Sequence, residues 1–347
     1  MIREVDFRYA IVRGSADFDE IYPIEGGEPT IRMDKDAAIK MSLSGTFAPN
    51  DRVDWLTDKI RPELILDGVS YPLGIFLPAS VIPVENESMK TLQVEAYDQC
   101  WLMQDYRNET PVTFSGSTKY LSAVQQLLTQ AGIGVSIVTQ NAATLSEIRT
   151  WEIGTSNLDI ANELLAEINY KELWFNADGL PVLEPKAAPG VENIQHRLDE
   201  ADVKSLLLPK ISRETDIYQA PNVFICVCAN PDKSSNMTAT AVNDYLNSPL
   251  SVQKRGRRIV KFVKLNNIAS QNELQAYANN LVRESLYVGE TVKIATGLLP
   301  GYGVGDVVAL NMAGVFSICI EKSWEMQLQV GGEMQHTLER VVYQYGA

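Results

Sequence analysis

Reactive and metal-binding side chains are scarce in this 347-residue chain, which contains only two histidines and four cysteines. Two histidines offer few possible bases for a nucleophilic triad. Neither His196 nor His336 lies beside a serine or cysteine in a recognisable motif, and His336 is predicted to face outward from a strand. A zinc site needs about four ligands, and the two histidines stand alone in the sequence. We therefore predict no catalytic residue, no metal site and no cofactor.

Long apolar runs and a basic surface are also lacking. The sequence has no run of ~18 apolar residues, so no transmembrane helix is expected. Residues Met1–Arg8 alternate charged and apolar side chains, which argues against a signal peptide. The net charge of −14 argues against a surface that grips nucleic acid and against docking on anionic lipid. We expect neither a membrane anchor nor specific nucleic-acid binding.

The cysteines are predicted to be buried free thiols: Cys100, Cys226, Cys228 and Cys319. Cys226 and Cys228 stand two apart in a strand-like run, so their side chains share one face. A C-x-C pair alone is weak evidence for a metal site. Free thiols fit a protein that is assembled in a reducing cytoplasm.

The most informative segment, residues 151–185, begins with a predicted helix. Ser156 is expected to cap this helix, and Asp159 lies in its first turn, where a negative charge suits the exposed N–H groups. Apolar residues recur at helical spacing and form one stripe, namely Leu158, Ala161, Leu164, Leu165 and Ile168. We expect the helix to stop at Asn169.

A hairpin is predicted to follow this helix. Leu173–Phe175 and Leu180–Leu183 are predicted to be short strands, and Asp178-Gly179 is a tight-turn dipeptide between them. The whole unit is too apolar for a catalytic site. It is better explained as a small architectural module, a helix packed on a two-stranded hairpin.

Strand-rich regions are predicted on both sides of this module. Residues 1–110 alternate in short runs, with a hairpin turn at Asp67-Gly68, and form the first predicted domain. Residues 111–190 form an α+β middle domain, in which Ser117 or Thr118 caps a further helix that Gly132 ends. Residues 191–347 form a second strand-rich domain with an inserted helix.

The second strand-rich domain contains four segments whose composition predicts a particular local structure. Residues 229–250 are rich in Asn, Ser, Asp and Pro and predict a long exposed loop. Ser270–Glu273 is a capping box for the inserted helix, whose apolar face is expected to hold Leu274, Tyr277, Leu281 and Val282. Gly301–Asp306 lacks the Lys-Ser/Thr ending of a phosphate loop, and a strand follows it, so a turn is predicted. Gly331-Gly332 is a candidate hairpin turn.

The order of these segments resembles that of the baseplate hub proteins of contractile phage tails and phage-tail-like bacteriocins, especially those of tailed phages and prophages of Gram-positive bacteria. The resemblance rests on the helix–hairpin module and on the later succession of strand, polar loop, basic cluster, capped helix and glycine-rich turn. It covers roughly residue 5 to the C-terminus. It implies a mainly β fold, in which two tube-like β-barrel domains flank the small helix-plus-hairpin domain.

The same resemblance implies a structural role without enzymatic activity. Such a hub forms a homotrimer and joins the tail tube protein to the central spike protein, which adapts threefold to sixfold symmetry. Baseplate wedge proteins would be further partners. The protein would be assembled in the bacterial cytoplasm and become part of a phage tail or tail-like particle.

One basic cluster stands out in the acidic chain, at Lys254, Arg255, Arg257 and Arg258. Such a short cluster on an acidic protein is often a local salt-bridging site. If the chain is a hub, we expect these residues to face carboxylates of a neighbouring subunit. A plain solvated loop is the alternative.

Two other functions are compatible with a tail protein. The first is a cell-wall hydrolase, but no metal cluster or Cys/His pair supports it. The second is a receptor- or glycan-binding protein, which would favour exposed aromatic residues in loops. The tryptophans instead lie mostly in patterned segments and are expected to pack in the core, namely Trp55, Trp101, Trp151, Trp174 and Trp324.

Overall fold

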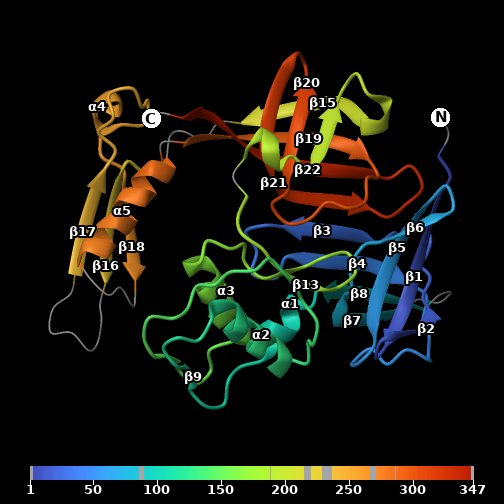
Figure 1. Cartoon of the computed structure of the whole chain (residues 1–347). Coiled ribbons are helices and arrows are strands. Elements are labelled where there is room, and N and C mark those ends of the chain that lie inside the picture. Colours follow the sequence, from blue (N-terminus) through green and yellow to red (C-terminus); the bar gives the residue numbers. More distant parts are fainter. Residues whose placement is uncertain are drawn as a thin grey trace. The chain divides into compact units, whose positions relative to one another are not determined.

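Strands form most of the regular structure, as the alternating sequence pattern predicts. The computed structural model describes residues 3–85, 90–187, 189–214, 220–228, 237–265, 271–285 and 287–344. Contacts divide the chain into two compact units (Figure 1). Unit 1 comprises residues 1–210, 294–316 and 320–337, and unit 2 comprises residues 211–293, 317–319 and 338–347.

The N-terminal strands of unit 1 are β1 (Val5–Arg13), β2 (Ala16–Glu20), β3 (Thr30–Asp34), β4 (Met41–Phe47), β5 (Lys59–Leu66), β6 (Val69–Pro72), β7 (Leu77–Glu85) and β8 (Lys90–Tyr97). Four of them form an antiparallel sheet in the order β2-β1-β5-β6. The predicted turn at Asp67-Gly68 joins β5 to β6, and both turn residues have positive φ. The hairpin prediction is therefore confirmed.

The other N-terminal strands join strands from the far end of the sequence. These are β14 (His196–Asp199), β15 (Leu207–Glu214), β19 (Tyr287–Gly297), β20 (Val307–Met312), β21 (Val315–Gln327) and β22 (Glu333–Gln344). The sheet runs β15-β19-β22-β21-β3-β4-β8-β7, and β20 pairs with both β14 and β21. Trp324 on β21 lies opposite Met33 on β3. Gly331-Gly332 forms the turn between β21 and β22, as predicted.

This sheet joins strands from the first and the third predicted domains. Among the described residues, the strand pairings form open sheets, and the two-barrel layout is not established by them. The boundaries at residues 110 and 190 stay a prediction.

The middle of unit 1 contains α1 (Cys100–Asp105), α2 (Tyr120–Gln130) and α3 (Asn157–Glu167), with short strands β9 (Val112–Phe114), β10 (Ile137–Val138), β11 (Arg149–Trp151), β12 (Trp174–Phe175) and β13 (Pro181–Leu183). The predicted helix–hairpin module is confirmed: α3 is followed by β12 and β13, which pair antiparallel. The Ser156 hydroxyl accepts a hydrogen bond from the Asp159 backbone N–H at 3.1 Å. Asn169 follows with φ of 58°.

The predicted cap of α2 is wrong. Lys119 occupies the N-cap position and makes no side-chain capping bond, whereas Ser117 has φ of 72° and lies in the preceding turn. The Ser115 and Thr118 hydroxyls bond to each other instead, at 3.1 Å. Gly132 ends the helix with φ of 82°, as predicted.

Two apolar cores stabilise unit 1. One lies between the N-terminal strands and the C-terminal strands and includes Phe47, Phe76 and Trp324. The other surrounds α2 and α3 and includes Leu127, Leu164 and Trp151. Short 3₁₀ turns at Val191–Asn193 and Val203–Ser205 connect the middle of the unit to the later strands.

Unit 2 contains a three-stranded sheet with one long helix against it. The strands are β16 (Val223–Cys228), β17 (Met237–Val242) and β18 (Val260–Leu265), in the order β17-β16-β18. Helix α5 (Gln271–Ser285) packs on this sheet, and the short helix α4 (Val252–Arg255) precedes β18 (Figure 1).

Strand β17 corrects the prediction of a loop over residues 229–250. Thr and Ala alternate in this strand, and such small side chains give only a weak hydrophobic pattern in the sequence. Ala239 and Ala241 are nevertheless buried against α5. Residues 229–236 lie outside the described residues, as does Ser270 of the predicted capping box. On α5, Leu274 is buried as expected, whereas Tyr277 is exposed and Ala278 takes its place in the core.

Candidate functional site

The glycine-rich turn at residues 301–306 lies among buried polar side chains of unit 1, including Asp306 and His336. Gly301 and Gly305 have φ of 94° and 66°, a conformation that side chains strongly disfavour. A Cβ atom on Gly303 would lie 3.0 Å from both the Trp174 ring and an Asp306 carboxylate oxygen. The turn then enters β20, as predicted. The glycines therefore let the backbone approach Trp174 closely, and no phosphate loop is formed.

Asp306 anchors this turn. Its carboxylate accepts hydrogen bonds from the Gly303 backbone N–H at 2.7 Å and from the Gln195 amide at 2.9 Å, and it contacts His196 Nε2 at 2.9 Å. Burial disfavours the ionised form, but the bonds from His196 and Gly303 and the charges of His196 and Lys171 outweigh it, so the pKa of Asp306 is lowered. The carboxylate is thus held ionised inside the fold.

Tyr302 links the two histidines. Its ring stacks on His196 with centroids 3.8 Å apart, and the His336 ring lies 4.9 Å away on a tilt. The prediction that His336 faces outward is wrong, since its side chain is almost completely buried. The strand pattern itself indicates the buried position, because Met334, His336 and Leu338 alternate with the less buried Gln335 and Thr337 and therefore share one face.

His336 lies in a row of side chains on three neighbouring strands, β19, β22 and β21. His336 Nδ1 is 2.9 Å from Glu321 Oε2, and His336 Nε2 is 3.1 Å from Thr296 Oγ1. All three side chains are buried. Burial raises the pKa of Glu321, and the charge and hydrogen bond of His336 offset this only in part.

This row has the residue types of a hydrolytic triad but the wrong hydrogen bonds. The Thr296 hydroxyl has one hydrogen, and it donates that hydrogen to the Gly297 carbonyl at 2.7 Å. In the contact with His336 the hydroxyl must therefore accept, and the ring nitrogen donates. A histidine in that state cannot take the hydroxyl proton, which a nucleophilic threonine requires. The row is a structural hydrogen-bond chain.

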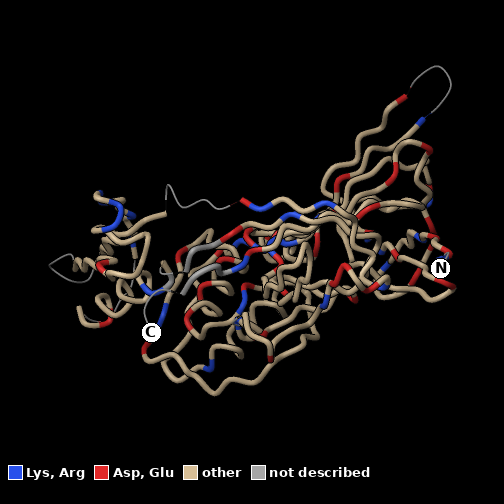
Figure 2. Tube along the Cα trace, turned by 90° about the horizontal axis from the view of Figure 1, so that it is seen from above, with Lys and Arg blue, Asp and Glu red and all other residues tan. Residues whose placement is uncertain are grey.

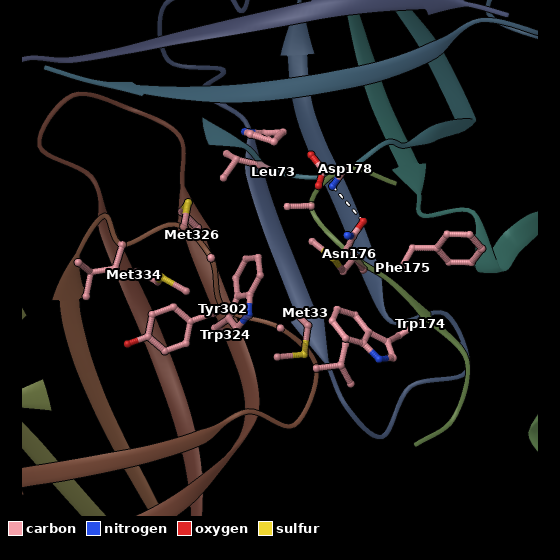
Figure 3. Close-up of a pocket in the computed structure, with 17 residues that line it drawn as sticks. Met33, Leu73, Trp174, Phe175, Asn176, Asp178, Tyr302, Trp324, Met326 and Met334 are labelled. Atoms are coloured by element: carbon pink, nitrogen blue, oxygen red, sulfur yellow. Dashed lines mark hydrogen bonds between the residues drawn. The ribbon is translucent and has the colours of Figure 1, made fainter. Parts of the chain in front are cut away.

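An apolar cavity of about 180 Å³ lies beside the glycine-rich turn (Figure 3). Methionine and aromatic side chains make up about half of its lining and include Met33, Met326, Met334, Trp174, Trp324 and Tyr302. Trp174 and Trp324 are both buried, as expected for core tryptophans. Flexible methionines fill irregular gaps well, so this cavity is read most simply as a loosely filled part of the core.

A second cavity, of about 330 Å³, lies next to Val304 and Gly305. Four lysines line it: Lys35, Lys40, Lys171 and Lys186. The Lys40 ammonium is buried and bonds to Glu172 Oε2 at 2.5 Å and to two backbone carbonyls. Lys171 bonds to the Val304 carbonyl at 2.7 Å and to Glu184 at 2.8 Å. These bonds satisfy the two innermost ammonium groups within the fold.

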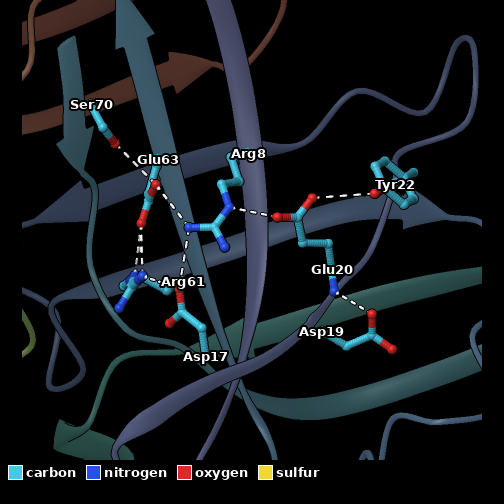
Figure 4. Close-up of polar contacts among 8 residues, drawn as sticks. All are labelled: Arg8, Asp17, Asp19, Glu20, Tyr22, Arg61, Glu63 and Ser70. Atoms are coloured by element: carbon cyan, nitrogen blue, oxygen red, sulfur yellow. Dashed lines mark hydrogen bonds and ion pairs between the residues drawn. The ribbon is translucent and has the colours of Figure 1, made fainter.

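A network of ion pairs covers the sheet β2-β1-β5-β6 (Figure 4). Arg8 contacts Glu20 at 2.6 Å, Asp17 at 3.2 Å and Glu63 at 3.5 Å, and Arg61 contacts Asp17 at 2.7 Å and Glu63 at 2.9 Å. The hydrogen bond from Arg8 to Glu20 is the main cause of a raised pKa of Arg8. Each arginine bridges separate strands, so the network fixes their alignment.

The predicted interface residues lie in unit 2, at and after α4. Ser251 caps α4 through the Lys254 backbone N–H, and Gly256 ends it with φ of 63°. Lys254, Arg257 and Arg258 are exposed, and the half-buried Arg255 donates to the Ala220 carbonyl at 2.6 Å. The cap and the glycine thus present a compact basic turn. Its role in subunit contact stays a prediction.

The cysteines are free and buried, as predicted. Within the described ranges, no cluster of histidine, cysteine and carboxylate side chains could hold a metal ion. In the same part of the chain, every helix is too short or too polar to cross a membrane.

Structural comparison places this fold among phage tail proteins, as the sequence order predicted. A tail protein from Neisseria meningitidis MC58 aligns over 96% of each chain with a TM-score of 0.69 and 13% identity. The 43 kDa tail protein of prophage MuSo2 from Shewanella oneidensis aligns over 96% of this chain and 98% of its own, with a TM-score of 0.67 and 10% identity. Prophage tail protein gp18 from Listeria monocytogenes EGD-e aligns over 98% and 95%, with a TM-score of 0.58 and 12% identity.

Sequence comparison alone finds nothing comparable. No protein-family model matches the chain, and no curated protein matches it in sequence. At 10 to 13% identity the likeness to the three tail proteins is one of fold.

Proposed function

We propose that this chain is a structural protein of a phage tail or tail-like particle, and specifically the baseplate hub. The observation that carries the proposal is the near-complete alignment with tail proteins, over 96% of this chain and 96% of the Neisseria meningitidis protein. A shared domain alone would leave part of each chain unmatched. The agreement over whole chains favours a shared architecture and a shared kind of role.

The hub assignment adds finer features to this role. Three copies would close into a ring that joins the tail tube to the central spike, with baseplate wedge proteins around it. Two tube-like barrels per chain, bounded near residues 110 and 190, would let three copies match a sixfold tube. A closed ring of identical copies requires two different surfaces on each chain, one for each neighbour.

The buried polar row supports a structural rather than an enzymatic role. The Thr296 hydroxyl donates to the Gly297 carbonyl, and the His336 ring bonds to the carboxyl group of Glu321. The basic turn at Lys254–Arg258 would then face carboxylates of a neighbouring subunit. Assembly in the bacterial cytoplasm would precede incorporation into the particle.

Particle assembly in a producing strain tests the proposal. We expect deletion of the gene to abolish complete baseplates in electron micrographs of purified particles, and the wild-type gene in trans to restore them. Normal baseplates without this protein would refute the structural role. The hub assignment requires labelled protein at the tail end; label along the tail or on fibres would contradict it. Turnover of purified peptidoglycan by the isolated protein would favour a hydrolase instead.

A further inference from the structure

Helix α5 covers one face of the three-stranded sheet of unit 2, whereas on the other face Val223 is buried at the start of β16 and the β18 residues are exposed. Helix α5 packs on the face that holds Phe224, Cys226 and Ala239, which are all buried. Successive side chains of a strand point to opposite faces, so the next residues along each strand belong to the other face. That face has no helix against it among the described residues of unit 2 (Figure 1).

Apolar side chains nevertheless occur on this open face. Ile225 of the central strand lies between Thr240 of β17 and Phe262 of β18. Phe262 is 69% exposed and Val260, two residues before it, is 41% exposed. Lys264 continues the same row. We call Val260, Phe262 and Lys264 the β18 face. An exposed phenylalanine in a row with a valine is costly in water and is typical of a contact surface.

The charge around the β18 face is opposite to that of most of the chain. Residues 254–264 contain six Lys and Arg and no Asp or Glu. Unit 2 as a whole has 11 basic and 8 acidic residues, whereas unit 1 has 19 basic and 36 acidic residues, a net charge of −17. Figure 2 shows the basic residues gathered at and after α4.

We infer that the β18 face, together with the basic turn at Lys254–Arg258, docks on the acidic unit 1 of a second copy of this chain. The contact pairs an apolar centre with a basic rim, and every copy supplies the complementary acidic surface. Because the two surfaces differ, the contact is head-to-tail, which is the kind that closes a ring. The inference rests on the proposed assembly of this chain with itself and names one surface that makes it.

Nucleic acid fits this surface less well. A phosphate backbone long enough to cover the basic turn would meet the field of a chain whose net charge is −14. A second copy carries the same net charge, but the 36 acidic side chains of its unit 1 can pair with these lysines and arginines at short range, while salt screens the repulsion between whole chains.

Self-association of the full chain over a concentration series tests the inference by light scattering. The test variant combines Phe262→Thr with Lys264→Glu. The control combines Leu56→Thr with Lys186→Glu, which likewise removes an exposed apolar side chain and reverses one lysine charge, at exposed positions of unit 1. We expect the test variant to associate ~10-fold more weakly or worse, since a central aromatic anchor is lost, and the control to match wild type. Added salt should weaken wild-type association.

Three results would overturn the inference. A wild-type chain that stays monomeric at every concentration forms no such contact. A test variant that associates like wild type shows that another surface is used, and in that case the hub proposal stands while this surface fails. Binding of a short DNA duplex at physiological salt, lost in the test variant without any self-association, would assign the surface to nucleic acid. Circular dichroism of the test variant shows whether it still folds, so that a lost contact is distinguished from a lost fold. Lys264→Glu alone is a milder variant for the same measurements.

Discussion

Two side-chain contacts of a carboxyl group with a nitrogen, similar in length, should differ greatly in what they contribute to stability. His336 and Glu321 are 2.9 Å apart and completely enclosed, whereas Lys90 and Glu85 are 2.7 Å apart and more than half exposed. Distance alone would rank the exposed pair as the stronger. Burial reverses the ranking, because water screens the exposed pair and cannot replace a lost partner in the enclosed one.

We therefore expect Glu321→Ala to lower the free energy of unfolding by about 1–3 kcal/mol, because it leaves the Nδ1 atom of His336 without a hydrogen-bond partner in a buried site. Glu321→Gln should cost less, since its amide group can still form a hydrogen bond with Nδ1 of His336. Glu85→Ala, the exposed control, should cause no measurable change.

Urea unfolding followed by tryptophan fluorescence measures these effects in the right part of the molecule. All five tryptophans lie in unit 1, as do Glu321 and His336, so the signal reports that unit alone. A loss below about 1 kcal/mol for Glu321→Ala would refute the argument from burial, because it would equal an exposed pair. Equal effects of the two alanine variants would refute it as well.

Four further outcomes follow from features of unit 1. Ser156→Ala removes the cap of α3 and should cost about 1 kcal/mol in urea unfolding; Ser117→Ala, outside any cap, should cost clearly less. Leu164→Ala empties part of a fully buried core and should cost about 2–5 kcal/mol by the same measurement. Gly303→Ala places a Cβ 3.0 Å from the Trp174 ring and should cost about 1–3 kcal/mol with a shift in tryptophan emission, and an unchanged spectrum would contradict the close approach. The lowered pKa of Asp306 means that its contribution is present above the usual carboxyl pKa and is lost as the pH falls through its lower folded pKa. Asp306→Asn should therefore flatten the fall in stability on acidification, and an unchanged acid slope would exclude this role.

The sequence pattern predicted those helices and strands whose contacts are made by residues close to them in the sequence. Ser156 and Asp159 belong to one helical turn, and Asp178-Gly179 joins two adjacent strands, so sequence contained all the information that those elements need. The order of such elements was enough to identify the fold of tail proteins.

Long-range pairings escaped prediction because no local signal encodes them. The contact of β3 with β21, for example, joins segments almost 300 residues apart. Strand β17 escaped for another reason, since alternating alanine and threonine give a weak hydrophobic pattern although both alanines are buried. The polar row of Thr296, His336 and Glu321 could be found only after its strands were placed side by side.

The division into units also determines how the molecule responds to cutting. The chain passes between unit 1 and unit 2 five times, because unit 2 takes its residues from three separate segments. All five passages lie inside paired strands, namely β15, β19, β21 and β22, so a single protease cut in a loop between strands leaves them intact. Each fragment then keeps strands that pair with the other fragment. The nicked protein should therefore migrate as one species in a native gel and as two in a denaturing gel.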